Sequence, residues 1–143
     1  MTPAIVFVEA DMLIAGSASK TGASFALLQL CELNVIYGIT CEQVITECRR
    51  NLKQKLPEAL KPFENIITNT VKVSQNPNQK DCKEHNQMAH EKDLPILTSA
   101  LQNQAKYLVT FNTKHYFPRP STSIQILQPK DILHKIRTIL SEI

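Results

Sequence analysis

Short apolar runs recur along the chain and alternate with longer segments in which apolar residues return every three or four positions. The first run, Ala4–Ile5–Val6–Phe7–Val8, is continuously apolar and rich in β-branched and aromatic residues, which is typical of a strand buried on both faces of a parallel sheet. Similar runs predict further extended segments at residues 35–39, 71–74, 107–110 and 124–127.

The segments between these runs have the spacing of amphipathic helices. A helix is predicted after a flexible stretch at residues 16–22, and another after Thr40, which we expect to act as its N-terminal cap. Two prolines punctuate a third helical stretch, and the polar segment 80–92 predicts a solvent-exposed helix. Further helices are expected from Asp93–Leu94–Pro95 onward and over residues 132–143.

Strands that alternate with helices predict an α/β fold of three layers, α/β/α, in which helices cover both faces of a central, mainly parallel sheet. The 143 residues contain no repeat, low-complexity tract or Gly/Ser linker that would divide them. We therefore expect one domain over residues 1–143, with a single ordinary core.

Composition narrows the class of protein. The first apolar run is too short to cross a bilayer, and Met1–Thr2–Pro3 lacks the basic start of a signal peptide. The cysteines, at positions 31, 41, 48 and 82, form no CxxC pair and no metal-site spacing, so we expect reduced and mostly packed thiols. These features predict a cytoplasmic protein. The net charge of +3 favours the approach of a polyanion but indicates no dedicated nucleic-acid arm.

Polar residues follow two of the predicted strands directly. Glu9 and Asp11 come after the first strand, and if the chain stays extended there, both carboxylates project to the same side. Thr110 and Asn112 follow the strand at 107–110 in the same arrangement. Because open parallel sheets bind ligands at the carboxyl ends of their strands, these oxygens are candidate ligands.

Two further acids lie on predicted helices. Asp93 precedes an apolar helix face by three and four residues, so its carboxylate continues that face toward the sheet; the alternative is an ordinary N-terminal cap. Glu47 borders the apolar face of its helix and is followed by Arg49 and Arg50, a combination that suits metal ligation and phosphate contact. The alternatives are a solvated side chain for Glu47 and a strand-end salt bridge for Glu9.

Other signals indicate no site. Lys20–Thr21 lacks the glycines of a phosphate-binding loop. His85 and His90 are five residues apart, which does not place two ligands on one helix face, and with His134 they are interpreted as exposed side chains. We therefore expect no zinc site.

Four segments, taken together, resemble PIN domains in their order and spacing. They are Val8–Leu13 with Glu9 and Asp11, Val44–Glu47, Asp93–Leu101, and Leu108–Asn112. The resemblance spans nearly the whole chain and is strongest for the stand-alone PIN proteins of prokaryotic toxin–antitoxin systems.

The resemblance implies a metal-dependent endoribonuclease that uses Mg²⁺ or Mn²⁺ to cut single-stranded RNA. Glu9 then takes the first acidic place, Asp11 the polar place two residues later, Glu47 the second acid and Asp93 the third. Asn112 takes the fourth place, Thr110 is a secondary ligand or orienting group, and Arg49 and Arg50 hold the RNA backbone. Members of the family commonly form homodimers and are inhibited by a small antitoxin.

This sequence departs from the family pattern at three positions. Glu9 replaces the usual Asp, so either Glu9 or Asp11 supplies the first carboxylate. Asn112 offers an oxygen without a charge, and His115 follows where some relatives have another Asp; it either touches substrate phosphate or packs in its loop. The rival hypotheses are a catalytically weakened PIN-like module that binds RNA or a partner, and a small phosphotransfer or nucleotide-binding protein whose acids cap helices.

Overall fold

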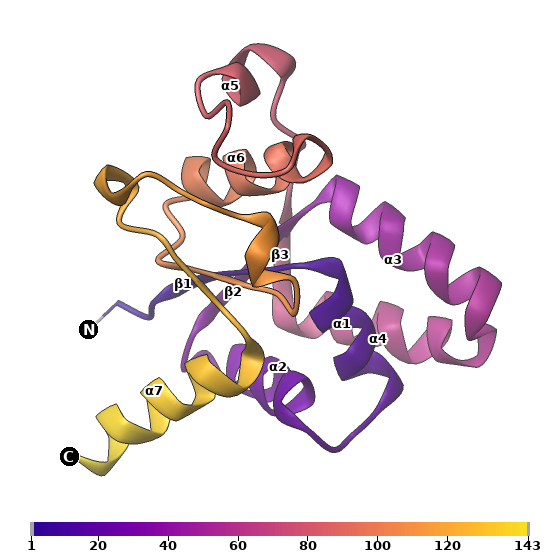
Figure 1. Ribbon diagram of the computed structural model, residues 1–143. Coiled ribbons are helices and arrows are strands. Elements are labelled where there is room, and N and C mark those ends of the chain that lie inside the picture. The colour runs from indigo at the N-terminus through magenta and orange to yellow at the C-terminus, as the bar shows by residue number, and fades with distance from the viewer. Residues whose placement is uncertain (1, 143) are drawn as a thin grey trace.

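The computed structural model describes residues 2–142, in which five parallel strands form one sheet of order β3-β2-β1-β4-β5 (Figure 1). The order confirms the predicted α/β fold, with β1 at the centre of the sheet. The strands are β1 (Ile5–Val8), β2 (Tyr37–Cys41), β3 (Val71–Ser74), β4 (Tyr107–Val109) and β5 (Gln125–Leu127).

Helices lie on both sides of this sheet, as a three-layer fold requires (Figure 1). α5 and α6 lie on one side, whereas α2 and α7 lie together on the other. No helix within residues 2–142 is long and apolar enough to cross a membrane. The helices are α1 (Ala10–Ala18), α2 (Ala23–Glu32), α3 (Glu42–Lys55), α4 (Leu60–Thr70), α5 (Gln79–Lys83), α6 (Leu94–Gln102) and α7 (Pro129–Ser141), with short 3-10 turns η1 (Pro57–Ala59), η2 (Glu91–Asp93), η3 (Thr113–His115) and η4 (Pro120–Thr122).

β1 is buried along most of its length. Val6, Phe7 and Val8 have no exposed surface, and β1 pairs in parallel with β2 on one side and β4 on the other. The chain moves outward from β1 in both directions, so the carboxyl ends of β1 and β4 form the topological switch point of the sheet. Open α/β sheets bind ligands at this position.

The expectation that Glu9 to Asp11 stay extended is wrong. α1 begins at Ala10, directly after Glu9, and the Leu13 N–H donates to the Glu9 carbonyl oxygen at 3.1 Å. The helix forms there because Met12 and Leu13 are both fully buried against the core. The predicted flexible stretch is shortened accordingly, since α1 continues to Ala18.

Two helix predictions also fail. The segment 80–92 is α-helical only as far as Lys83, in α5, because Met88 and Ala89 are buried and Ala89 forms an antiparallel bridge with Tyr116. Thr40 does not cap α3: β2 continues to Cys41, and the buried Thr40 hydroxyl donates to the Val8 carbonyl oxygen at 2.8 Å. This hydrogen bond ties the ends of β1 and β2 together beside the switch point.

We expect Thr40→Val to lower the free energy of unfolding by about 1–2 kcal/mol, since it removes a buried hydrogen bond while keeping the side-chain shape. The measurement is urea denaturation. Thr68→Val is the matched control, because the Thr68 hydroxyl is exposed and bonds only to its own helix at Glu64. Equal effects of the two substitutions would contradict a tie between β1 and β2.

Candidate active site

Glu9 is a buried carboxylate at the end of the central strand. Its side chain is held by the Thr110 hydroxyl, which donates to Oε2 at 2.8 Å, and only 8% of the residue is exposed. Burial raises the pKa of Glu9 to about 7; the Thr110 hydrogen bond opposes the rise, whereas the charges of Asp11 and Asp93 add to it. The buried Tyr116 hydroxyl faces Glu9 and favours its charged form, although no hydrogen bond of good geometry joins the two.

Asp11 joins the start of α1 to the segment after β4. Its Oδ2 atom accepts hydrogen bonds from the Thr110 hydroxyl at 3.1 Å, the Phe111 N–H at 2.9 Å and the Asn112 side-chain amide at 3.2 Å. Oδ1 accepts from the Met12 N–H at 2.7 Å. Burial raises the pKa of Asp11, and the Phe111 N–H is the strongest opposing contact. Most of the acceptor capacity of this carboxylate is therefore used within the protein.

Glu47 comes from α3, which packs beside the start of α1. The Cys48 thiol is buried there and donates to the Ala10 carbonyl oxygen at 3.6 Å. Burial raises the pKa of Cys48, and the charges of Glu47, Asp11 and Glu9 raise it further. The Cys48–Ala10 contact brings the segment of α3 that carries half-buried Glu47 close to the start of α1, where Glu9 and Asp11 lie.

Asp93 does not act as a helix cap. It stands where η2 ends and α6 begins, but its side chain makes no capping hydrogen bond. Oδ2 instead lies 3.1 Å from His115 Nδ1, and the carboxylate is near enough to raise the pKa of Glu9. The His115 side chain is therefore in contact with a site acid.

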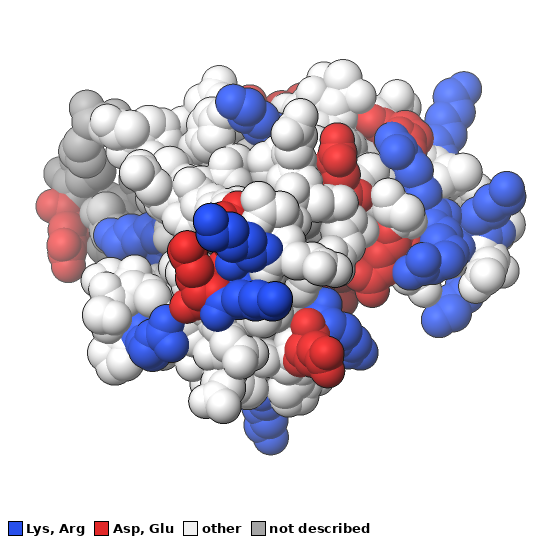
Figure 2. Space-filling model, turned by 90° about the horizontal axis from the view of Figure 1, so that it is seen from above, with Lys and Arg blue, Asp and Glu red and all other residues white. Residues whose placement is uncertain are grey.

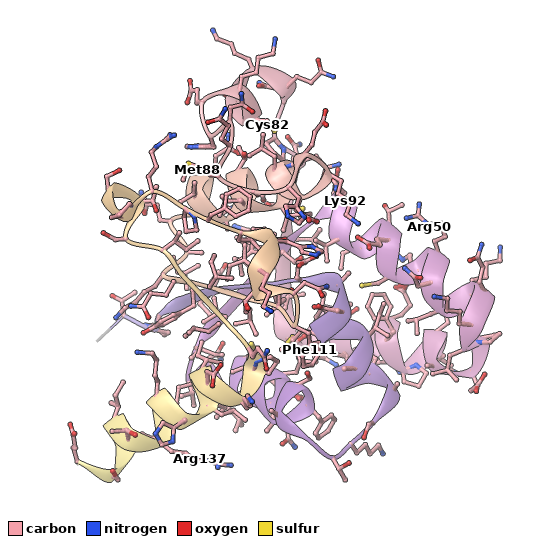
Figure 3. All side chains as sticks on the ribbon, in the orientation of Figure 1. Arg50, Cys82, Met88, Lys92, Phe111 and Arg137 are labelled. Carbon is pink, nitrogen blue, oxygen red and sulfur yellow. The ribbon has the colours of Figure 1, made fainter. Side chains whose placement is uncertain are left out.

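The two candidate RNA-binding arginines both lie on α3 but differ in their contacts. Arg49 is paired with Glu64 of α4 through hydrogen bonds of 2.6 and 3.0 Å, both side chains being largely exposed. Arg50 is also exposed and extends from the outer side of α3 (Figure 3). Figure 2 shows basic side chains gathered at the α3 end of the molecule, with acidic side chains beside them.

The acids at the switch point have the charge pattern of a cation site. Within residues 2–142, no Lys or Arg forms an ion pair with Glu9, Asp11, Glu47 or Asp93. Close carboxylates without basic partners repel one another, and hard divalent ions prefer such oxygen donors. The donor chemistry therefore fits Mg²⁺ or Mn²⁺.

The four acids do not converge on one point, however. In the described part of the chain, the one set of three or more His, Cys, Asp or Glu ligand atoms within 4.8 Å of one another is His90, Asp93 and His115. Neither histidine was predicted to be a ligand, and His90 was expected to be simply exposed. The two histidines are 25 residues apart in sequence, so no local spacing relates them. A bridge between Ala89 and Tyr116 brings them together.

We expect Glu9→Gln to stabilise the metal-free protein at pH 8 by roughly 1–3 kcal/mol and to have little effect near pH 5. The folded protein keeps Glu9 protonated up to about pH 7, whereas the unfolded chain loses this proton near 4.5. The folded state binds more protons between these values, so this contribution to stability falls as the pH rises.

Urea denaturation in EDTA at both pH values measures this effect. Glu58→Gln is the control, since Glu58 is exposed on η1 and its loss should give no such pH dependence. A difference between Glu9→Gln and the wild type that is equal at pH 5 and pH 8 would show that Glu9 is not held protonated.

Comparisons with known proteins agree with this fold. A chain in the crystal structure of VapBC2 from Rickettsia felis bound to a DNA fragment from their promoter superposes with a TM-score of 0.64, covering 86% of this chain and 98% of that one. The sequence identity is 14%, so the likeness concerns the fold. No curated protein sequence matches. The PIN-domain profile matches residues 5–114, which include all the site residues named from Glu9 to Asn112. This chain belongs to the PIN-domain family, whose members are generally nucleases.

Proposed function

We propose that this protein is a metal-dependent endoribonuclease of PIN type, which hydrolyses phosphodiester bonds of single-stranded RNA with Mg²⁺ or Mn²⁺. The observation that carries the proposal is the group of carboxylates without basic partners at the switch point of the sheet. Single-stranded RNA as substrate rests on the resemblance of the four sequence segments to PIN ribonucleases.

The hydrogen bonds of the site favour Glu9 over Asp11 as the first metal ligand. Asp11 already accepts bonds from three donors at one oxygen, which suits it to fixing the segment after β4. Glu9 accepts one side-chain hydrogen bond from Thr110 and keeps acceptor capacity. Glu9, Glu47 and Asp93 would therefore hold the ion once their side chains turn toward it, with Asp11, Thr110 and Asn112 as positioning residues.

A bound divalent ion would supply charge stabilisation at the phosphate and an activated water. The chain's own residues have the complementary tasks. Arg50, which is exposed on α3, would contact the RNA backbone, while Arg49 would first have to exchange Glu64 for a phosphate. The buried strand end keeps the Glu9 carboxylate in a dry environment, where its interaction with a cation is strengthened.

The comparison with VapBC2 also supports a partner. The likeness to VapBC2 agrees with the resemblance of the four sequence segments to PIN proteins of toxin–antitoxin systems. We therefore propose that this chain is the toxin of such a pair, and that it is cytoplasmic, homodimeric and inhibited by a small antitoxin protein. Co-purification with the product of a neighbouring gene, followed by native mass spectrometry, tests the partner and the dimer together.

The second candidate function is a catalytically weakened module that binds RNA or a partner. The specific observation in its favour is Asn112, whose side-chain amide donates to Asp11 at 3.2 Å. An ionised acid at this position would have no proton to donate, so the fourth place is used here to clamp Asp11 rather than to add charge.

Asp93→Asn, Glu9→Gln and Glu47→Gln should each reduce cleavage of a labelled single-stranded RNA at least ~100-fold, because each removes a charged metal ligand. The assay compares Mn²⁺, Mg²⁺ and EDTA. Glu91→Gln is the control, since it removes an exposed charge from the same short turn as Asp93. Folded wild-type protein that binds RNA but never cleaves it would establish the weakened module instead.

Arg50→Ala should weaken RNA binding at low salt and reduce the slope of log affinity against log salt by about 0.7, the value of one lost phosphate contact on a single strand. Fluorescence anisotropy at several salt concentrations measures it. Arg137→Ala is the matched control, because Arg137 lies on α7, away from α3 (Figure 3). Equal losses of RNA affinity in the two variants would show that RNA does not contact α3 specifically.

A further inference from the structure

His90, Asp93 and His115 form a compact group of metal-ligating side chains at the edge of the proposed nuclease site. Their ligand atoms all lie within 4.8 Å of one another, and the His90 and His115 rings stack with centroids 4.4 Å apart at 29°. Asp93 Oδ2 is already 3.1 Å from His115 Nδ1. Ligand atoms of a tetrahedral zinc ion lie roughly 3.3 Å apart, so this pair has the separation of two such ligands.

The backbone holds the two histidines together. The His90 N–H donates to the His115 carbonyl oxygen at 2.9 Å, and the Phe117 N–H donates to the Met88 carbonyl oxygen at 2.8 Å. The Asp93 N–H in turn donates to the His90 carbonyl oxygen at 2.8 Å. The group is thus fixed by main-chain contacts, and only the side chains need to move for the three ligand atoms to converge.

The donor atoms of the histidine group suit a different kind of ion than the carboxylates of the proposed nuclease site do. Two imidazole nitrogens and one carboxylate suit Zn²⁺ and related borderline ions, whereas Mg²⁺ prefers oxygen donors alone. His90 is exposed, and about a third of the His115 side chain is accessible, so the group faces solvent. Three protein ligands at an open surface leave a fourth position for water.

We propose that His90, Asp93 and His115 form a binding site for Zn²⁺. The site shares Asp93 with the proposed nuclease centre but does not depend on any cleavage activity. The opposing interpretation is that the same three side chains only hold two loops together, by stacking and by the Asp93–His115 hydrogen bond. The two interpretations differ in what they predict for added metal.

Cobalt(II) is the probe, because its visible spectrum distinguishes tetrahedral nitrogen and oxygen coordination from the weak octahedral spectrum of the free ion. Titration of the EDTA-stripped full-length protein should give intense bands that saturate at one equivalent and disappear when Zn²⁺ is added. His90→Asn and His115→Asn should each weaken Co²⁺ binding at least ~10-fold. His134→Asn, at an exposed position of α7, should leave the titration unchanged.

Circular dichroism and thermal melting verify that each variant is folded. His90→Asn is the decisive variant if His115→Asn does not fold, because His90 is exposed and its substitution leaves the Asp93–His115 bond intact. A wild-type spectrum that stays octahedral, or one that His90→Asn does not change, would overturn the proposal and leave the three side chains as a loop contact.

Glu9→Gln separates this proposal from the proposed nuclease. The variant should lose RNA cleavage and keep the tetrahedral Co²⁺ spectrum, because Glu9 is not a member of the histidine group. Co²⁺ bands in a wild-type protein that cuts no RNA would refute only the nuclease. Cleavage with Mg²⁺ by a protein that gives no Co²⁺ bands would refute only the zinc site.

Discussion

The burial of the last three residues of β1 is the constraint from which the site follows. Val6, Phe7 and Val8 are enclosed by strands on both sides and helices on both faces, so the residue that follows them leaves the core at the switch point with little access to water. That residue is Glu9. The cost of desolvating its carboxylate is the main reason for its raised pKa, and the nearby acids add to it. The same burial that stabilises the sheet thus makes the charged form of Glu9 unfavourable in the metal-free protein, and a nearby cation would favour it.

Asp11 gives the site its rigidity. Its carboxylate joins the first turn of α1 to Thr110, Phe111 and Asn112, about a hundred residues later in the chain. These contacts join the segment that follows β1 to the segment that follows its neighbour β4, and they fix the loop that continues to His115. The acids at the strand ends and the histidine group are consequently parts of one connected region.

Much of this region could be predicted from the sequence because its signals are local. A continuous apolar run marks β1, and the polar residues after β1 and β4 must meet where parallel strands end. The start of α1 was missed because Glu9 and Asp11 fit a strand and a helix equally well, and buried Met12 and Leu13 decide for the helix. Asp93 has the local pattern of a helix cap, but its side chain contacts His115 from a distant loop instead of the helix N-terminus. The His90–His115 pair depends on a bridge between distant loops, which no spacing encodes.

The Thr110 hydroxyl has a single proton and two acidic neighbours, Glu9 at 2.8 Å and Asp11 at 3.1 Å. It can satisfy only one of them at a time. A cation bound at Glu9, as proposed, would free this proton for Asp11, and the bond to Asp11 would then strengthen the attachment of the segment after β4. By reciprocity, a firmly attached segment would raise the affinity for the cation by the same factor. One hydroxyl group would thus link ion binding thermodynamically to the order of this loop.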